Sequence, residues 1–334
     1  MKNYNVFIGI DVSKETLDII GINDESEILL NHQIISNKVS SIKSFFKKAS
    51  VNFIKDQMLV TYEDTGIYSN HLDKVFSLLK INYCKVSALE IKKSKGLQRG
   101  KSDKDDAKAI AYYALSHKNK MRLSEPLENN ILHLRVLYSQ REKIITAIQT
   151  FNSNKELDDF IPKSIIKDLA KTQNSIINNL KKNLKTIDDQ INKIIHNNTL
   201  ITIYYDLINT IPGIGTQTAV YLIIATRAFT RFSNSRQLAC YCGIAPFPYE
   251  SGTSIKGKNK VSQFADKKLK TLLNMCALNA KKYDPQIKLY FDKKLKEGKN
   301  KMLILNNIRN KLVHRVFAVI KRQQPYVITH TFAA

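Results

Sequence analysis

The stretch VFIGIDVSK at residues 6–14 opens the part of the chain that decides its fold. The apolar run Val6–Ile10 has the length of one buried strand, and Asp11 follows it directly. Two further strand-like segments come next, and helices and strands then alternate. We expect strands at residues 6–10, 17–22, 28–35, 58–62 and 83–87, and helices at residues 39–55, 68–80 and 103–115. Three meandering strands followed by alternating helices and strands predict an α/β domain with a mixed sheet.

Four carboxylates lie where such a domain would bring them together. Asp11 and Glu63 each follow directly on an apolar strand, in FIGIDVSK and LVTYEDTG. Asp103 and Asp106 open a predicted helix on one helical face, with Ser102 as the expected N-cap. Four hard oxygen donors suit two Mg²⁺ ions, which can activate an attacking oxygen and stabilise a leaving one in phosphoryl transfer. For any single one of these residues, a capping or exposed carboxylate is an equally good interpretation.

The charge of the chain is strongly positive and unevenly distributed. Its 334 residues include 53 Lys and Arg against 29 Asp and Glu, a formal net charge of +24. Residues 1–124 and 125–200 carry +6 and +2, whereas residues 201–334 carry +16, from 22 basic and 6 acidic side chains. This balance predicts a polyanionic partner, and it places the main surface for a phosphate backbone in the last part of the chain. A lysine-rich surface that merely aids solubility is the weaker alternative.

Other features favour nucleic acid over a membrane as that partner. No segment is apolar over about 18 residues, so no transmembrane helix is expected. The first apolar run ends at Asp11 and is too short for a signal peptide. The cysteines lack zinc-ligand spacing and are expected to be reduced packing residues, which suits a cytoplasmic protein. They are Cys84, Cys240, Cys242 and Cys276.

Residues 125–200 have the pattern of long helices, because they lack glycine and carry apolar residues at spacings of three and four. The apolar positions are Ile176, Leu180, Leu184, Ile187, Ile191 and Ile194. An earlier helix at about residues 127–151 could pair with this seam in antiparallel fashion. The pattern predicts a coiled coil that spaces or assembles the protein, and an ordinary helical bundle remains the alternative.

Residues 201–334 are expected to be mainly helical, with breaks at 211–215, at 244–253 and at Gly298. The first break, IPGIG, has the form of a helix-hairpin-helix turn. Gly213 and Gly215 permit a tight turn, and backbone N–H groups at the start of the next helix can hold a phosphate. A plain glycine-containing connection between two helices is the alternative.

The second break contains a serine followed by closely spaced lysines, in CGIAPFPYESGTSIKGKNK at residues 242–260. Lys256, Lys258 and Lys260 could neutralise a phosphate near Ser251. A serine hydroxyl is a poor nucleophile unless a base takes its proton or its target is polarised. From spacing alone, Ser251 is therefore more simply interpreted as an ordinary loop serine.

These motifs, taken in order, resemble a known family. GIDVSK, YEDTG and SDKDDA, followed by IPGIG and RQLACYCGIAPFPYESG, are similar to the DEDD-type insertion-sequence transposases related to the Piv DNA invertase. Those proteins are bridge-RNA-guided recombinases. The resemblance covers nearly the whole chain and keeps the order of the motifs, and its specificity comes from the carboxylate set together with the Ser-Gly pair.

The resemblance implies an N-terminal RuvC-like domain of the ribonuclease H type at residues 1–124, a coiled coil at 125–200, and a transposase domain with a helix-hairpin-helix at 201–334. It implies that the four carboxylates hold Mg²⁺ and that Ser251 attacks DNA to form a transient phosphoserine link. It further implies donor DNA, target DNA and a structured non-coding guide RNA as partners, and a dimer or tetramer whose active sites combine residues of different subunits.

Two other functions remain open from the residues alone. The first is a RuvC-like structure-specific endonuclease, in which Ser251 would be structural and no protein–DNA adduct would form. The second is a non-catalytic nucleic-acid-binding protein, which would tolerate alanine at Asp11 and Glu63.

Overall fold

The computed structural model describes residues 4–94, 102–152, 160–251 and 255–328. Contacts between residues divide the chain into two compact units, Met1–Leu127 and Glu128–Ala334. The three-part division expected from the sequence, with boundaries after residues 124 and 200, stays a prediction. None of the described helices combines the length and the apolar character that crossing a bilayer requires.

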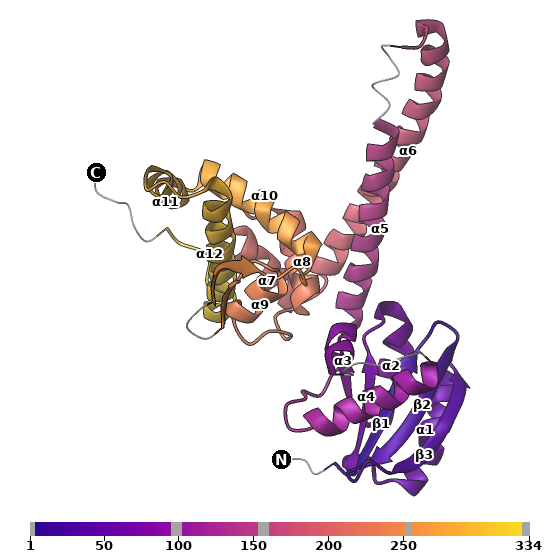
Figure 1. Ribbon diagram of the computed structural model, residues 1–334. Coiled ribbons are helices and arrows are strands. Elements are labelled where there is room, and N and C mark those ends of the chain that lie inside the picture. Colours follow the sequence, from indigo (N-terminus) through magenta and orange to yellow (C-terminus); the bar gives the residue numbers. More distant parts are fainter. Residues whose placement is uncertain (1–3, 95–101, 153–159, 252–254, 329–334) are drawn as a thin grey trace. The chain divides into compact units, whose positions relative to one another are not determined.

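A five-stranded mixed sheet forms the centre of the first unit (Figure 1). Its strands are β1 (Val6–Val12), β2 (Thr16–Asn23), β3 (Ile28–Ser36), β4 (Met58–Glu63) and β5 (Asn82–Val86). They lie in the order β3-β2-β1-β4-β5, with β2 antiparallel to β1 and β3, and with β1, β4 and β5 parallel. This arrangement confirms the expected α/β fold with a mixed sheet of the ribonuclease H type.

Helices cover both faces of this sheet. Successive residues of β1 point to opposite sides and so enter two separate cores. Ile8 and Ile10 are buried in one core, which includes residues of α1 (Val39–Asn52) and α2 (Asn70–Leu79). Phe7 lies in a second core, which includes residues of α4 (Asp103–His117). Each strand of the sheet centre is therefore buried on both sides, as the continuous apolar runs in the sequence indicated.

The helix ends differ slightly from the sequence-based expectation. Helix α1 ends at Asn52, because Phe53 is extended, with φ −126°. Short 3-10 helices follow at Lys55–Gln57 and precede α2 at Gly66–Ser69. A further helix, α3 (Ala88–Ser94), was not predicted. Helix α4 begins as expected, with the side chain of Ser102 accepting a hydrogen bond from the backbone N–H of Asp105.

The second unit begins with two long helices, α5 (Asn129–Asn152) and α6 (Lys163–His196), which lie side by side (Figure 1). Arg141 of α5 donates a hydrogen bond to Asp188 of α6 over 2.7 Å. Of the predicted apolar seam, Ile191 is buried, but Ile176 is 37% exposed and its neighbour Ile177 is buried instead. The helical pairing is thus present, while the seam is only partly enclosed by a single partner helix.

The rest of the second unit is mainly helical, as expected. Its helices are α7 (Thr199–Asn209), α8 (Thr216–Thr226), α9 (Ser235–Tyr241), α10 (Lys267–Tyr283), α11 (Pro285–Lys296) and α12 (Lys301–Arg322). The break at 244–253 is more regular than predicted. There the chain forms an antiparallel hairpin of β6 (Pro246–Ser251) and β7 (Ile255–Val261), which the prolines and lysines of the segment concealed.

Candidate functional site

A glycine in the central strand allows α4 to lie directly on the sheet. A Cβ atom added at Gly9 would come within 2.1 Å of the carbonyl oxygen of Ala107 and 2.4 Å of the backbone nitrogen of Ala111. Both alanines are buried, so small side chains on the helix complete this close contact. The contact fixes the first turns of α4 beside the carboxyl end of β1, where Asp11 is located.

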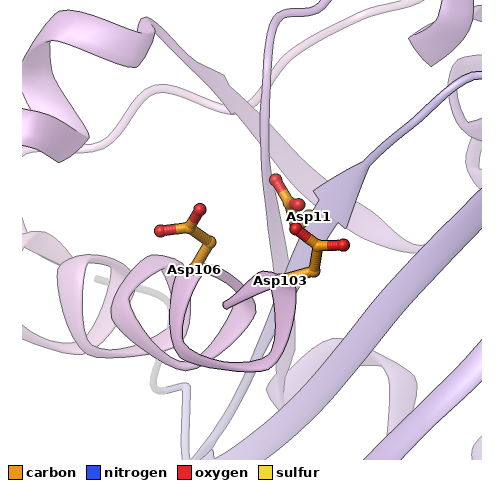
Figure 2. Close-up of side chains that lie close together, drawn as sticks. All are labelled: Asp11, Asp103 and Asp106. Carbon is orange, nitrogen blue, oxygen red and sulfur yellow. The ribbon is translucent and has the colours of Figure 1, made fainter. Parts of the chain in front are cut away.

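Three carboxylates meet at this edge of the sheet (Figure 2). Asp11 comes from β1, and Asp103 and Asp106 come from the first turn of α4. One ligand atom from each residue lies within 4.8 Å of the others. Asp11 and Asp106 are half-buried, whereas Asp103 is exposed, so the cluster opens to solvent on one side.

Glu63 is the last residue of β4, the parallel neighbour of β1, in which Tyr62 pairs with Ile10. The next positions along the two strands are Glu63 and Asp11, so the expected convergence of strand ends holds for the backbone. The Glu63 carboxylate lies outside the close group of three, but it is near enough to raise the pKa of Asp11.

The acidic cluster disfavours the charged form of Asp11. Burial is the largest cause, and repulsion from Asp106, Asp103, Glu63 and Asp18 adds to it, so that the pKa of Asp11 rises from 3.8 to about 6. Repulsion of this kind is relieved by a bound cation. A donor set made only of carboxylate oxygens suits hard divalent ions, so the residues present fit such a metal.

A fifth carboxylate adjoins the cluster, and the sequence did not indicate it. Asp18 of β2 pairs with Asp11 in the β1–β2 register and is only 6% exposed. Its Oδ1 lies 2.6 Å from Nε2 of His32 on β3. Since Asp18 falls within an apolar strand pattern, the only signal in the sequence was a charged residue at a position expected to be buried.

The second predicted centre lies in the β6–β7 hairpin. Ser251 was expected in a loop, but its backbone ends β6 and pairs with Ile255. Lys256, Lys258 and Lys260 occupy every second position of β7, and Lys260 is exposed. Gly252, which follows the serine, lies outside the described residues.

The IPGIG segment forms the turn between α7 and α8. Gly213 has φ +92°, and a Cβ there would lie within 2.7 Å of three atoms of Ala280 on α10. Gly215 stands at the N-cap of α8 with φ −96°, and a Cβ there would meet open space. Gly213 is therefore required both by backbone conformation and by close packing, whereas Gly215 is required by neither.

The helices after the hairpin carry the positive charge that the sequence located there. Exposed cations occur on α10, α11 and α12 and on the turn before α12. They are Lys267, Lys282, Lys288, Lys293, Lys296, Lys299, Lys301, Lys311, Lys321 and Arg322. Such a surface is suited to a phosphate backbone.

Two transposase family models match the chain. One, for the DEDD transposases of the IS110 type, matches residues 8–157, and the other, the transposase IS116/IS110/IS902 family, matches residues 205–292. The pilin gene-inverting protein of Moraxella lacunata is 27% identical over 96% of this chain and 97% of its own length. A protein of insertion element IS110 from Streptomyces coelicolor is 26% identical over 41% of this chain and 33% of its own length.

Among solved structures, RuvC of Thermus thermophilus in complex with a Holliday junction substrate matches with a TM-score of 0.30 and 11% identity, over 36% of this chain and all of that one. The strand order of the five-stranded sheet defines the fold of the first unit. Together, the family models span both predicted centres, the carboxylate cluster and the hairpin of Ser251. The chain belongs to the DEDD transposases of the IS110 family.

Proposed function

We propose that this transposase exchanges DNA strands with a Mg²⁺-binding carboxylate site and a serine nucleophile, under the guidance of a structured RNA. Membership of the family makes the chain a DNA-cleaving and DNA-rejoining enzyme, and a DEDD site implies a divalent metal. The observation that supports the proposal most directly is the meeting of Asp11, Asp103 and Asp106 at the carboxyl end of β1.

Asp11, Asp103 and Asp106 would hold the metal, with Glu63 completing the set from β4. Mg²⁺, when bound, neutralises charge on the scissile phosphate and lowers the pKa of oxygens bound to it. The protein's own contribution is placement, because α4 is fixed on β1 by Gly9 and carries two of the ligands. Burial and the neighbouring carboxylates raise the pKa of Asp11 to about 6, and a bound cation would relieve the repulsion at neutral pH, where Asp11 is mostly ionised.

Ser251 would form the covalent intermediate. Its hydroxyl loses a proton as the oxygen attacks phosphorus, the bond from phosphorus to the leaving deoxyribose oxygen breaks, and that oxygen takes up a proton. A hydroxyl of a second deoxyribose then loses its proton as its oxygen attacks the phosphorus. The bond from phosphorus to the serine oxygen breaks, and the serine takes up a proton. Lys256, Lys258 and Lys260 follow on β7 and would neutralise the phosphate, while the turn at Gly213 and Gly215 would contact the backbone of the nucleic acid.

Donor DNA, target DNA and a guide RNA would be the partners, and the exposed cations of α10–α12 support binding of phosphate backbones. Assembly into a dimer or tetramer has its own support. Helices α5 and α6 expose apolar side chains that a second copy could cover. They are Val136, Ile165, Leu169 and Ile176, which are 46%, 61%, 44% and 37% exposed.

An excision assay with the complete element, including its non-coding flanks, tests the proposal. We expect Ser251→Ala and Asp11→Ala each to abolish strand exchange. Ser233→Ala and Asp105→Asn serve as matched controls, because Ser233 is an exposed serine of the same unit and Asp105 lies outside the carboxylate cluster. Normal recombination by Ser251→Ala would exclude the nucleophile.

Trapping of the protein–DNA link separates the recombinase from a nuclease. Denaturation during the reaction should leave DNA covalently attached to the unchanged chain and to Ser233→Ala, but not to Ser251→Ala. Cleavage of DNA with no adduct in any variant would favour a RuvC-like endonuclease. Full activity without the guide RNA would contradict the guidance but not the chemistry.

A further inference from the structure

Arg309 of α12 is a buried cation that no other described residue neutralises. The residue is 7% exposed, and its Nε is enclosed without a hydrogen-bond partner. Burial lowers the pKa of its guanidinium, and no neighbouring carboxylate offsets that effect. Because an isolated buried charge is costly, a buried arginine with no carboxylate partner and an unpartnered Nε requires an explanation.

Another arginine of the same helix does have hydrogen-bond partners for its guanidinium. Arg315, six positions further along α12, donates from Nη1 to the buried carboxylate of Asp284 and from Nη2 to Oε1 of Gln286 over 3.3 Å. The fold therefore supplies a carboxylate for one arginine of α12 and none for the other. Arg309 is suited to an anion that comes from outside the chain.

The turn of α12 that contains Arg309 lies against the base of the β6–β7 hairpin. Asn306, one helical turn before Arg309, donates a hydrogen bond to the carbonyl oxygen of Ile244 over 2.9 Å. Ile244 lies two residues before β6, the strand that ends at Ser251. The same end of the hairpin carries a cation, since Nζ of Lys270 lies 3.7 Å from where a Cβ of Gly243, the residue before Ile244, would be.

The composition of residues 201–334 favours a phosphate as the anion that Arg309 binds. Residues 201–334 contain only 6 acidic side chains against 22 basic ones. Three of those acids, Asp266, Asp284 and Glu297, already accept hydrogen bonds from other side chains. A planar guanidinium binds a phosphodiester through two parallel hydrogen bonds, which repays burial of the cation better than a single contact does.

We propose that Arg309 forms a phosphodiester-binding site at the base of the hairpin that carries Ser251. The site rests on the proposed function, since it needs a nucleic acid bound to this unit. It would fix the position of the backbone relative to the hairpin and would read no sequence. The phosphodiester can belong to the DNA or to the guide RNA.

Binding measured as a function of salt tests the site. A labelled DNA duplex and a labelled RNA hairpin are titrated separately with the full chain and with Arg309→Met. For the nucleic acid that uses the site, we expect Arg309→Met to make the slope of log binding constant against log salt concentration less steep. If that nucleic acid is the duplex DNA, the change in slope should be about 0.9. At fixed salt, binding should weaken by roughly ten- to a hundredfold. An effect on one probe alone identifies the source of the phosphate.

Arg135→Met is the matched control, because Arg135 of α5 is an exposed arginine of the same unit that lies outside the cationic surface of α10–α12. Equal decreases of the salt slope in the two variants would mean that Arg309 contributes only through the net charge of the protein, and would overturn the site. Arg309→Lys keeps the charge and should keep the slope while binding more weakly.

Thermal unfolding provides a second readout. Arg309→Met should keep or raise the Tm of the free protein, since it removes an unpaired buried charge. A lower Tm would show that the arginine is structural and would overturn the site. Unchanged binding by Arg309→Met would overturn this inference alone, whereas failure of the unchanged chain to bind either probe would overturn the proposed function as well.

Discussion

Gly9 of β1 and Ala107 of α4 are in backbone contact: a Cβ atom at residue 9 would lie 2.1 Å from the carbonyl oxygen of Ala107. The helix that carries Asp103 and Asp106 is therefore held against the strand that carries Asp11 by the absence of a side chain. The geometry of the carboxylate cluster depends on this contact as much as on the carboxylates themselves.

Gly9→Ala should displace α4 and disperse the carboxylates. We expect a loss of about 1–3 kcal/mol in the free energy of unfolding, because backbone atoms must move to admit the methyl group. Strand exchange should fall much further than this loss of stability explains. Chemical denaturation and the excision assay measure the two effects. Gly215→Ala is the control for stability, since a Cβ at that position meets open space; an equal loss in both variants would argue against the contact.

Asp11→Asn should stabilise the metal-free protein while abolishing its activity. In the fold, the pKa of Asp11 is about 6, above its ordinary value of 3.8, so the folded state disfavours the charged carboxylate. The wild-type protein therefore loses stability relative to Asp11→Asn as the pH rises from about 4 to about 6, and the difference stays constant above that. Thermal unfolding in the presence of a chelator measures the difference, and a gap that shrinks with rising pH would contradict it.

Binding of Mg²⁺ should compete with the proton on Asp11. Affinity should fall as the pH drops below about 6, because Asp11 then becomes protonated. At neutral pH, Mg²⁺ should raise the Tm of the wild-type chain, and a chelator should reverse the rise. Asp106→Asn should lose the response, whereas Asp105→Asn should retain it. Titration calorimetry provides the affinities, and binding that is independent of pH would place the metal elsewhere.

Gly213→Ala should destabilise the second unit. Gly213 has φ +92° and would bring a Cβ within 2.7 Å of the backbone of Ala280. Strain and overlap together should cost about 2–4 kcal/mol. Gly215→Ala, two residues away, should cost less than about 1 kcal/mol, the difference between glycine and alanine at a helix N-cap. Denaturation of the two variants side by side checks the contrast, and a comparable loss in both would mean that the turn as a whole, and not Gly213, is constrained.

The first unit was predictable from sequence because its strands are short apolar runs that end in polar turns. The residues that place the site were harder to find. In the sequence Gly9 is only one residue of an apolar strand, since its role appears only when α4 lies on top of it. Asp18 and His32 are 14 residues apart and meet through the pairing of β2 with β3.

The second unit was less predictable where its backbone is least typical. The hairpin of β6 and β7 contains two prolines and several lysines, which are uncommon within strands, so the segment was expected to be a loop. Arg309 had no distinguishing signal at all. It stands in a helix among many exposed cations, and only the structure separates the one that is buried.

The length of α6 can be expressed on the scale of duplex DNA. With 34 residues, the helix spans about 51 Å at 1.5 Å per residue. A base pair of duplex DNA occupies about 3.4 Å, so the helix measures about 15 base pairs from end to end. Lengthening it by one turn would add about 5.4 Å, or roughly one and a half base pairs. Insertions or deletions of whole turns would therefore change the length of α6 without altering any residue of the carboxylate cluster.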